Sequence, residues 1–113
     1  RRLDAMEELE DSVVVGQSWN NDVRVILFVK LAHGKELTED LINRIRLDIR
    51  THASPRHVPA KIIACPDVPY TLNMKKVELA VKKVIEGKEV KNKDALKNPE
   101  ALDFFADLEE LQT

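Results

Sequence analysis

The chain is poor in several residue types, and each shortage limits what it can do. It has one cysteine, Cys65, so it can form neither an internal disulfide nor a cluster of thiolate metal ligands. Only three glycines occur, and they do not form the glycine-rich loop that cradles phosphates in nucleotide-binding proteins. No apolar run approaches the roughly 20 residues that a membrane-spanning helix requires. A disulfide scaffold, a self-contained nucleotide site of this kind and a membrane span are therefore not expected.

Charge of either sign is not in excess. The 113 residues include 18 Lys and Arg and 20 Asp and Glu, a formal net charge of −2. This balance gives no overall attraction to nucleic acid or to membrane surfaces. We therefore expect no binding to nucleic acid. Hydrophobic residues make up 43% of the chain, which suits one globular domain. No signal peptide is recognisable in the charged opening residues, so we expect a cytoplasmic protein.

Alternating apolar residues predict the strands. A β-branched run predicts a short strand over residues 12–16, and a longer alternation predicts a second strand over residues 22–32. The short polar segment between them favours an antiparallel pair. A third strand is expected over residues 60–65. Together with the helices, these strands predict an α+β fold with a small three-stranded, mainly antiparallel sheet.

Apolar residues at helical spacing predict three helices around this sheet. One is expected over residues 3–9, and another over residues 38–52 with Thr38 as its N-cap. A third helix should begin at or just after Lys75 and close at Gly87.

The end of the chain differs in composition from the rest. Residues 88–97 are polar and rich in lysine, which is typical of a linker. Asn98 as N-cap and Pro99 at the first helical position predict a tail helix. We therefore expect a core over residues 1–87 and a linker with tail helix over residues 88–113. Because no residue caps the first helix, we also expect the core to lack its natural beginning and the chain to be a fragment.

The most distinctive stretch follows the third predicted strand and runs Pro69-Tyr70-Thr71-Leu72-Asn73-Met74-Lys75. A lysine beside the start of a helix is placed to meet an anion. The stretch resembles the P-x-T-x-[ST]-G-K loop near the C-terminus of adenylate-forming acyl-CoA synthetases. Residues 54–59 upstream and 75–78 downstream resemble the members that activate acetoacetate. Met74 occupies the glycine position, and we expect it to lack the positive φ that glycine permits.

The resemblance extends over essentially the whole chain and implies the small C-terminal domain of an ATP-dependent acid–CoA ligase. In this family a large N-terminal adenylation domain binds ATP, Mg²⁺ and the acid. The small domain first supplies a lysine for acyl-adenylate formation and then rotates to help form the thioester with CoA. The family's hinge and its CoA-contacting hairpin would lie upstream of Arg1.

Roles for individual residues also follow from the resemblance. Lys75 takes the catalytic position, and Thr71 and Asn73 take positions in the substrate-binding loop. Arg50, which follows Ile49, matches an Ile/Val-Arg pair that contributes to CoA binding. The implied substrates are acetoacetate, ATP and CoA, and we expect the isolated chain to be inactive and to hold no cofactor tightly.

Two other functions fit the sequence. One is a ligase for another short-chain acid such as acetate. The other is a non-catalytic module whose lysines bind an anionic partner; these would be Lys75, Lys76, Lys82, Lys83 and Lys88. On spacing alone, Lys75 and Lys76 could also be ordinary lysines at the start of a solvated helix.

The remaining residues with reactive side chains predict no further site. His33, His52 and His57 have neither metal-ligand spacing nor a paired nucleophile, so we expect them on the surface. Cys65 ends an apolar run, which predicts a buried structural thiol. No cluster of carboxylates with metal-ligand spacing is recognisable in the sequence.

Overall fold

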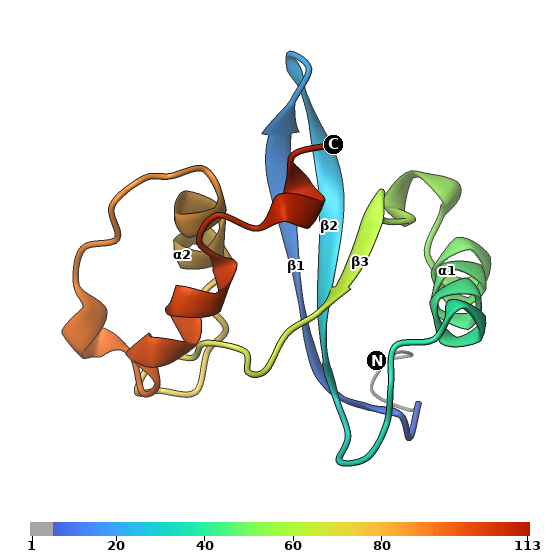
Figure 1. Cartoon of the computed structure of the whole chain (residues 1–113), viewed down its shortest axis with the longest axis horizontal. Helices are drawn as coiled ribbons and strands as arrows, with labels where there is room; N and C mark the ends of the chain where they lie inside the picture. The colour runs from blue at the N-terminus through green and yellow to red at the C-terminus, as the bar shows by residue number, and fades with distance from the viewer. Residues whose placement is uncertain (1–5) are drawn as a thin grey trace.

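A long β-hairpin forms the centre of the molecule (Figure 1). The structure is a computed structural model, and it describes residues 6–113. Strand β1 (Leu9–Trp19) pairs antiparallel with β2 (Asp22–Leu31), as predicted. Asn20 and Asn21 form the turn with φ of 50° and 62°, a left-handed conformation that asparagine tolerates and that matches the twist of the strands. Because this turn takes only two residues, β1 continues past the predicted residues 12–16 to Trp19, and at its other end it begins at Leu9, opposite Leu31.

The third strand completes a mixed sheet. Strand β3 (Lys61–Ala64) lies beside β2 and runs parallel to it, giving the order β1-β2-β3. A parallel neighbour requires a crossover connection, and helix α1 (Glu39–His52) supplies it. The antiparallel pair is much longer than the parallel one. The predicted α+β class with a mainly antiparallel sheet is therefore confirmed.

The two faces of the sheet are covered by different elements (Figure 1). Helix α1 begins after Thr38, whose Oγ1 accepts a hydrogen bond from the Leu41 N–H at 3.1 Å, as the N-cap prediction requires. It covers one face; helix α2 (Glu78–Ile85) and the C-terminal tail cover the other. Among residues 6–113, no helix is long and apolar enough to span a membrane. The cluster under α1 contains Leu9, Leu27, Val29, Leu41, Ile45 and Ile62, and the opposite cluster includes Ile26, Phe28, Ile63, Val81, Leu102 and Phe105.

The helix predicted over residues 3–9 is wrong for its described part. Met6 has irregular backbone, and Leu9 begins β1 opposite Leu31. The Leu9 side chain is buried against the sheet face that α1 covers, so strand pairing and burial outweigh the helical spacing. Residues 1–5 of that prediction lie outside the described part of the chain.

The tail does not form one α-helix, although a helix begins at Pro99 with Asn98 in the N-cap position, as predicted. The tail instead forms short 3₁₀ helices at Lys93–Ala95, Pro99–Phe105 and Glu109–Leu111. The Asn98 side chain does not cap that helix, because it bonds to residues on a distant loop. The tail nevertheless buries several apolar side chains in the core: Leu96, Ala101, Leu102, Phe105 and Leu111.

Candidate active-site hairpin

The stretch around Lys75 folds into a tight hairpin. Tyr70 and Lys76 form a β-bridge at its base. The Thr71 N–H donates to the Lys75 carbonyl at 2.8 Å, and the Met74 N–H donates to the Thr71 carbonyl at 2.9 Å. The Lys75 N–H in turn donates to Thr71 Oγ1 at 3.1 Å. These three bonds fix the backbone on either side of the Lys75 side chain.

Helix α2 begins later than the sequence pattern predicts. The expected start at or just after Lys75 is wrong, because the helix begins only at Glu78, with Val77 at the N-cap position. Lys75 and Lys76 are held in the returning arm of the hairpin by the bridge and the bonds to Thr71. The hairpin, rather than the first turn of a helix, therefore positions the Lys75 ammonium.

Met74 occupies the one left-handed position of this hairpin. Its φ is 63°, at the place where a three-residue hairpin loop commonly has glycine. The expectation that Met74 would lack this conformation is wrong. Methionine adopts it at a cost of about 1–2 kcal/mol, the usual penalty for a residue with a Cβ. The residue is 56% exposed, and its sulfur lies 3.5 Å from Lys97 Nζ.

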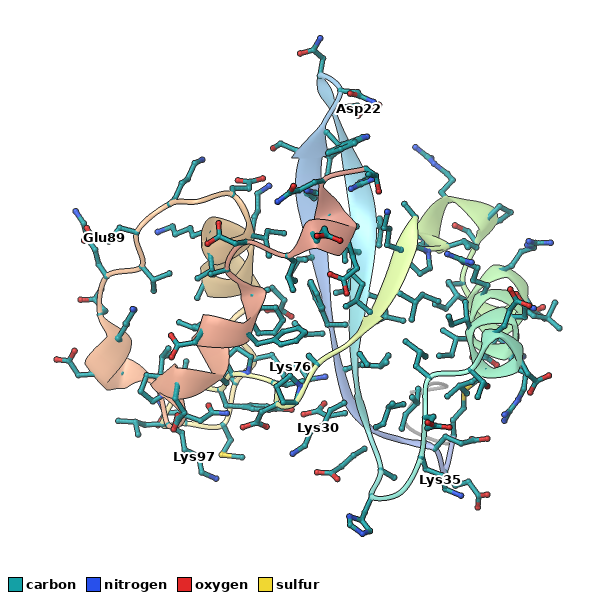
Figure 2. The ribbon with its side chains drawn as sticks, in the orientation of Figure 1. Asp22, Lys30, Lys35, Lys76, Glu89 and Lys97 are labelled. Atoms are coloured by element: carbon teal, nitrogen blue, oxygen red, sulfur yellow. The ribbon has the colours of Figure 1, made fainter. Side chains whose placement is uncertain are left out.

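The two adjacent lysines of the hairpin have different environments. Lys76 Nζ lies 3.3 Å from Asp11 Oδ1, and the other carboxylate oxygen of Asp11 accepts a hydrogen bond from the Tyr70 hydroxyl. Figure 2 shows Lys76 where the hairpin approaches the sheet. Lys75 is exposed, and within residues 6–113 no carboxylate pairs with its ammonium. Lys76 therefore ties the hairpin to β1, whereas Lys75 is open to an external anion.

The predicted site residues fall into two groups. Thr71 and Asn73 share the hairpin with Lys75; the Thr71 hydroxyl is occupied by the Lys75 N–H, and Asn73 is exposed at the turn. Arg50 is exposed in the last turn of α1, on the opposite face of the sheet (Figure 1). The structure therefore brings three of the four predicted residues together and separates Arg50 from them.

Sequence reasoning missed a polar network that supports the hairpin. Asn98 Oδ1 accepts the Tyr70 N–H at 2.9 Å, and its Nδ2 donates to Asp67 Oδ2 at 2.8 Å and the Val68 carbonyl at 3.0 Å. Lys30 of β2 lies 3.3 Å from Asp67 Oδ1 (Figure 2). Burial alone would raise the pKa of Asp67, but the bonds from Asn98 and Lys30 outweigh it and lower that pKa. No local spacing announces this network, since its members are far apart in sequence.

The other reactive side chains lie outside this arrangement. Cys65 is buried, as predicted, and burial raises the pKa of its thiol to about 12, which excludes a thiolate nucleophile at neutral pH. His33, His52 and His57 are exposed, as predicted. In the described part of the chain, no group of three or more His, Cys, Asp or Glu side chains is placed to share a metal ion.

The chain is similar to known acyl-CoA synthetases, although no family model matches it. It is 57% identical over 112 residues to the acetoacetyl-coenzyme A synthetase of Rhizobium meliloti (strain 1021), covering 99% of this chain and 17% of that protein. It is 49% identical to the Gallus gallus acetoacetyl-CoA synthetase, over 97% of this chain and 17% of that one.

Two solved structures of acyl-CoA synthetases are also similar to this chain. The acetoacetyl-CoA synthetase from Streptomyces lividans matches with a TM-score of 0.84 and 33% identity, over 97% of this chain and 17% of its own. A Brucella canis acyl-CoA synthetase matches with a TM-score of 0.65 and 26% identity, over 72% of this chain and 15% of its own.

The fold is that of the C-terminal region of acyl-CoA synthetases of the adenylate-forming class. Within that class, the chain is a homologue of the C-terminal region of acetoacetyl-CoA synthetases. It spans about 17% of the length of the curated relatives cited above.

Proposed function

We propose that this chain is the mobile C-terminal domain of an AMP-forming acid–CoA ligase and that Lys75 promotes acyl-adenylate formation. The observation that carries the proposal is the contrast within the hairpin. Lys76 is paired with Asp11, whereas Lys75 is exposed on a hydrogen-bonded turn with no described carboxylate partner. The similarity to acetoacetyl-CoA synthetases supports the same reaction class.

The chemistry needs a cation at this position. In adenylation, a carboxylate oxygen of the acid attacks the α-phosphorus of ATP while the bond to the bridging oxygen breaks and pyrophosphate leaves. Negative charge accumulates on the phosphate oxygens, and a compact ammonium such as that of Lys75 stabilises it in a site closed to water. Thr71 and Asn73 would shape the turn that presents this ammonium to the substrates.

The rest of the site must come from another domain. Within residues 6–113 there is no cluster of carboxylates suited to Mg²⁺, and the sequence has no glycine-rich phosphate loop. We therefore propose an N-terminal adenylation domain as the partner, which would hold ATP, Mg²⁺ and the acid. The 17% of each relative that this chain covers leaves ample length for such a domain.

We propose that Arg50 acts in the second half-reaction. Arg50 is exposed in the last turn of α1. A guanidinium can bind two phosphate oxygens at once through parallel hydrogen bonds. The Lys75 hairpin and α1 lie on opposite sides of the sheet, so Lys75 and Arg50 would face the N-terminal domain in different orientations of the C-terminal domain. We propose that Arg50 contacts a phosphate of CoA after rotation and that Lys75 has then left the site.

We propose acetoacetate as the acid, because the names of the similar proteins specify it. The test uses the complete ligase, meaning this chain continuous with its N-terminal adenylation domain. Exchange of pyrophosphate into ATP would be compared with acetoacetate, acetate and butyrate. We expect acetoacetate to support the fastest exchange. Faster exchange with acetate or butyrate would reassign the acid, and no exchange with any of them would contradict the ligase.

A module that binds an anionic partner is less well supported. Three of its candidate lysines are already paired with carboxylates: Lys76 with Asp11, and Lys82 and Lys88 with Glu86 at 2.8 and 3.7 Å. Salt-dependent binding of the chain to nucleic acid or polyphosphate would be the evidence in its favour.

A further inference from the structure

The C-terminal tail adds a strand-like neighbour to the Lys75 hairpin. The Leu72 N–H donates to the Ala95 carbonyl at 2.9 Å, and the Lys97 N–H donates to the Tyr70 carbonyl at 2.9 Å. An isolated two-stranded hairpin is marginally stable in water, and a third strand is usually needed for independent order. The backbone that carries Lys75 therefore depends on bonds from the tail.

Asn98 strengthens this connection at the base of the hairpin. Its amide group makes three hydrogen bonds, to the Tyr70 N–H, the Asp67 carboxylate and the Val68 carbonyl. These groups lie in the segment that leads into the turn, beside a hollow of about 280 Å³ that Met74 also lines. Removal of the amide would leave the partly buried Tyr70 N–H and Val68 carbonyl without this partner, so the segment would be free to shift.

The other end of the tail is fixed to the sheet. Phe105 packs edge-to-face on Phe28 of β2, with ring centroids 4.8 Å apart. The Leu111 carbonyl accepts hydrogen bonds from Gln17 Nε2 of β1 at 3.1 Å and from the Arg24 guanidinium of β2 at 3.2 Å. The tail thus joins the sheet to the hairpin, in addition to the contacts that Tyr70 and Lys76 make with Asp11.

We propose that the tail is a positioning element for Lys75 and that Asn98 is its central positioning residue. The proposal rests on the proposed function of Lys75 in adenylation. Displacement of a catalytic group by about 1 Å can lower a rate by about a hundredfold, so a loosened hairpin lowers adenylation. Thioester formation does not use the hairpin in the proposed reaction, so it is spared.

The test is the Asn98→Ala variant of the complete ligase, assayed in both half-reactions. We expect acetoacetate-dependent ATP–pyrophosphate exchange to fall by about ten- to a hundredfold. Thioester formation from preformed acetoacetyl-adenylate should be unchanged. The control is Leu111→Ala, which weakens packing at the far end of the tail without touching the hairpin and should leave the ratio of the two rates unchanged.

Exchanging the donor and the acceptor separates the positioning of the hairpin by Asn98 from a general loosening of the fold. In the double variant Asp67→Asn/Asn98→Asp, the two side chains exchange roles but keep the hydrogen bond between them. An oxygen also remains at position 98 to accept the Tyr70 N–H. A carboxylate at position 98 cannot donate to the Val68 carbonyl, so we expect the swap to recover only part of the exchange rate that Asn98→Ala loses. Hydrogen exchange of residues 71–75 should be faster in Asn98→Ala and return toward the parent rate in the swap.

The outcomes distinguish this proposal from the one on which it rests. Selective loss of adenylation in both Lys75→Ala and Asn98→Ala supports both. Selective loss in Lys75→Ala alone, or equal loss of both half-reactions in Asn98→Ala, overturns the role of the tail and leaves that of Lys75 intact. Unchanged adenylation in Lys75→Ala overturns both.

Discussion

The Phe105→Ala substitution should destabilise the whole domain, although Phe105 lies in a tail that the sequence presents as peripheral. Its side chain is fully buried, and its ring packs edge-to-face on Phe28 and on Phe104, with centroid distances of 4.8 and 5.3 Å. Truncating a buried phenylalanine to alanine costs about 3–5 kcal/mol, because apolar contacts are lost and a cavity remains. The lost ring pairs act in the same direction.

We therefore expect the free energy of unfolding to fall by about 4 kcal/mol, a large fraction of the roughly 5–15 kcal/mol typical of a domain. With an unfolding entropy of about 2.1 cal/mol/K per residue, that loss lowers the Tm of this 113-residue chain by about 17 °C.

Urea unfolding of the chain, followed by circular dichroism, measures the effect directly. The matched control is Phe104→Ala, since Phe104 belongs to the same 3₁₀ helix but is only half-buried. The control should lose about 1–2 kcal/mol, less than a fully buried ring does. Equal losses at the two positions, or a loss at Phe105 below about 1.5 kcal/mol, would show that the tail does not belong to the core.

Three further predictions concern Met74 in the hairpin, the dependence of stability on pH, and the binding of CoA. Met74→Gly should change the free energy of unfolding by less than about 1 kcal/mol in urea titrations, because relief of the left-handed conformation is offset by the greater freedom of unfolded glycine. The Glu86 carboxylate accepts hydrogen bonds from Lys82 Nζ and the Ser18 N–H, which lower its pKa from 4.5 to about 2. Because the folded pKa lies below the unfolded one, this stabilisation is complete above pH 4.5 and is lost as the pH falls toward 2. Glu86→Gln should therefore cost about 1–2 kcal/mol at neutral pH and much less in acid, as urea unfolding at both pH values would show. Arg50→Ala should raise the KM for CoA by about tenfold or more and leave ATP–pyrophosphate exchange unchanged; a change in exchange would contradict its assignment to the second half-reaction.

The sheet and α1 could be predicted because their signals are local. The alternation over β2, the β-branched run in β1 and the Thr38 cap each depend on residues a few positions apart. Lys75 could be singled out because its flanking residues match a family pattern. The parallel direction of β3 was not specified, since a crossover through α1 is a property of the whole topology.

The features that could not be predicted depend on contacts between distant residues. Asn98 and Pro99 form a valid helix-start signal, but the Asn98 side chain is used by residues 67–70 instead. The late start of α2 has a similar cause, because Lys76 is held at the base of the hairpin by Tyr70 and Asp11. Met74 shows the limit of a propensity argument, since a hairpin bonded on both sides imposes a conformation that methionine alone would avoid.

The most direct test of the account compares Lys75→Ala with Lys76→Ala in the complete ligase, in each half-reaction separately. We predict that Lys75→Ala lowers acetoacetate-dependent ATP–pyrophosphate exchange by about a hundred- to a thousandfold and leaves thioester formation from preformed adenylate intact. Lys76→Ala, which breaks the ion pair with Asp11, should lower exchange far less. Equal loss in both half-reactions for Lys75→Ala, or a deeper loss for Lys76→Ala, would contradict the assignment of Lys75 to adenylation.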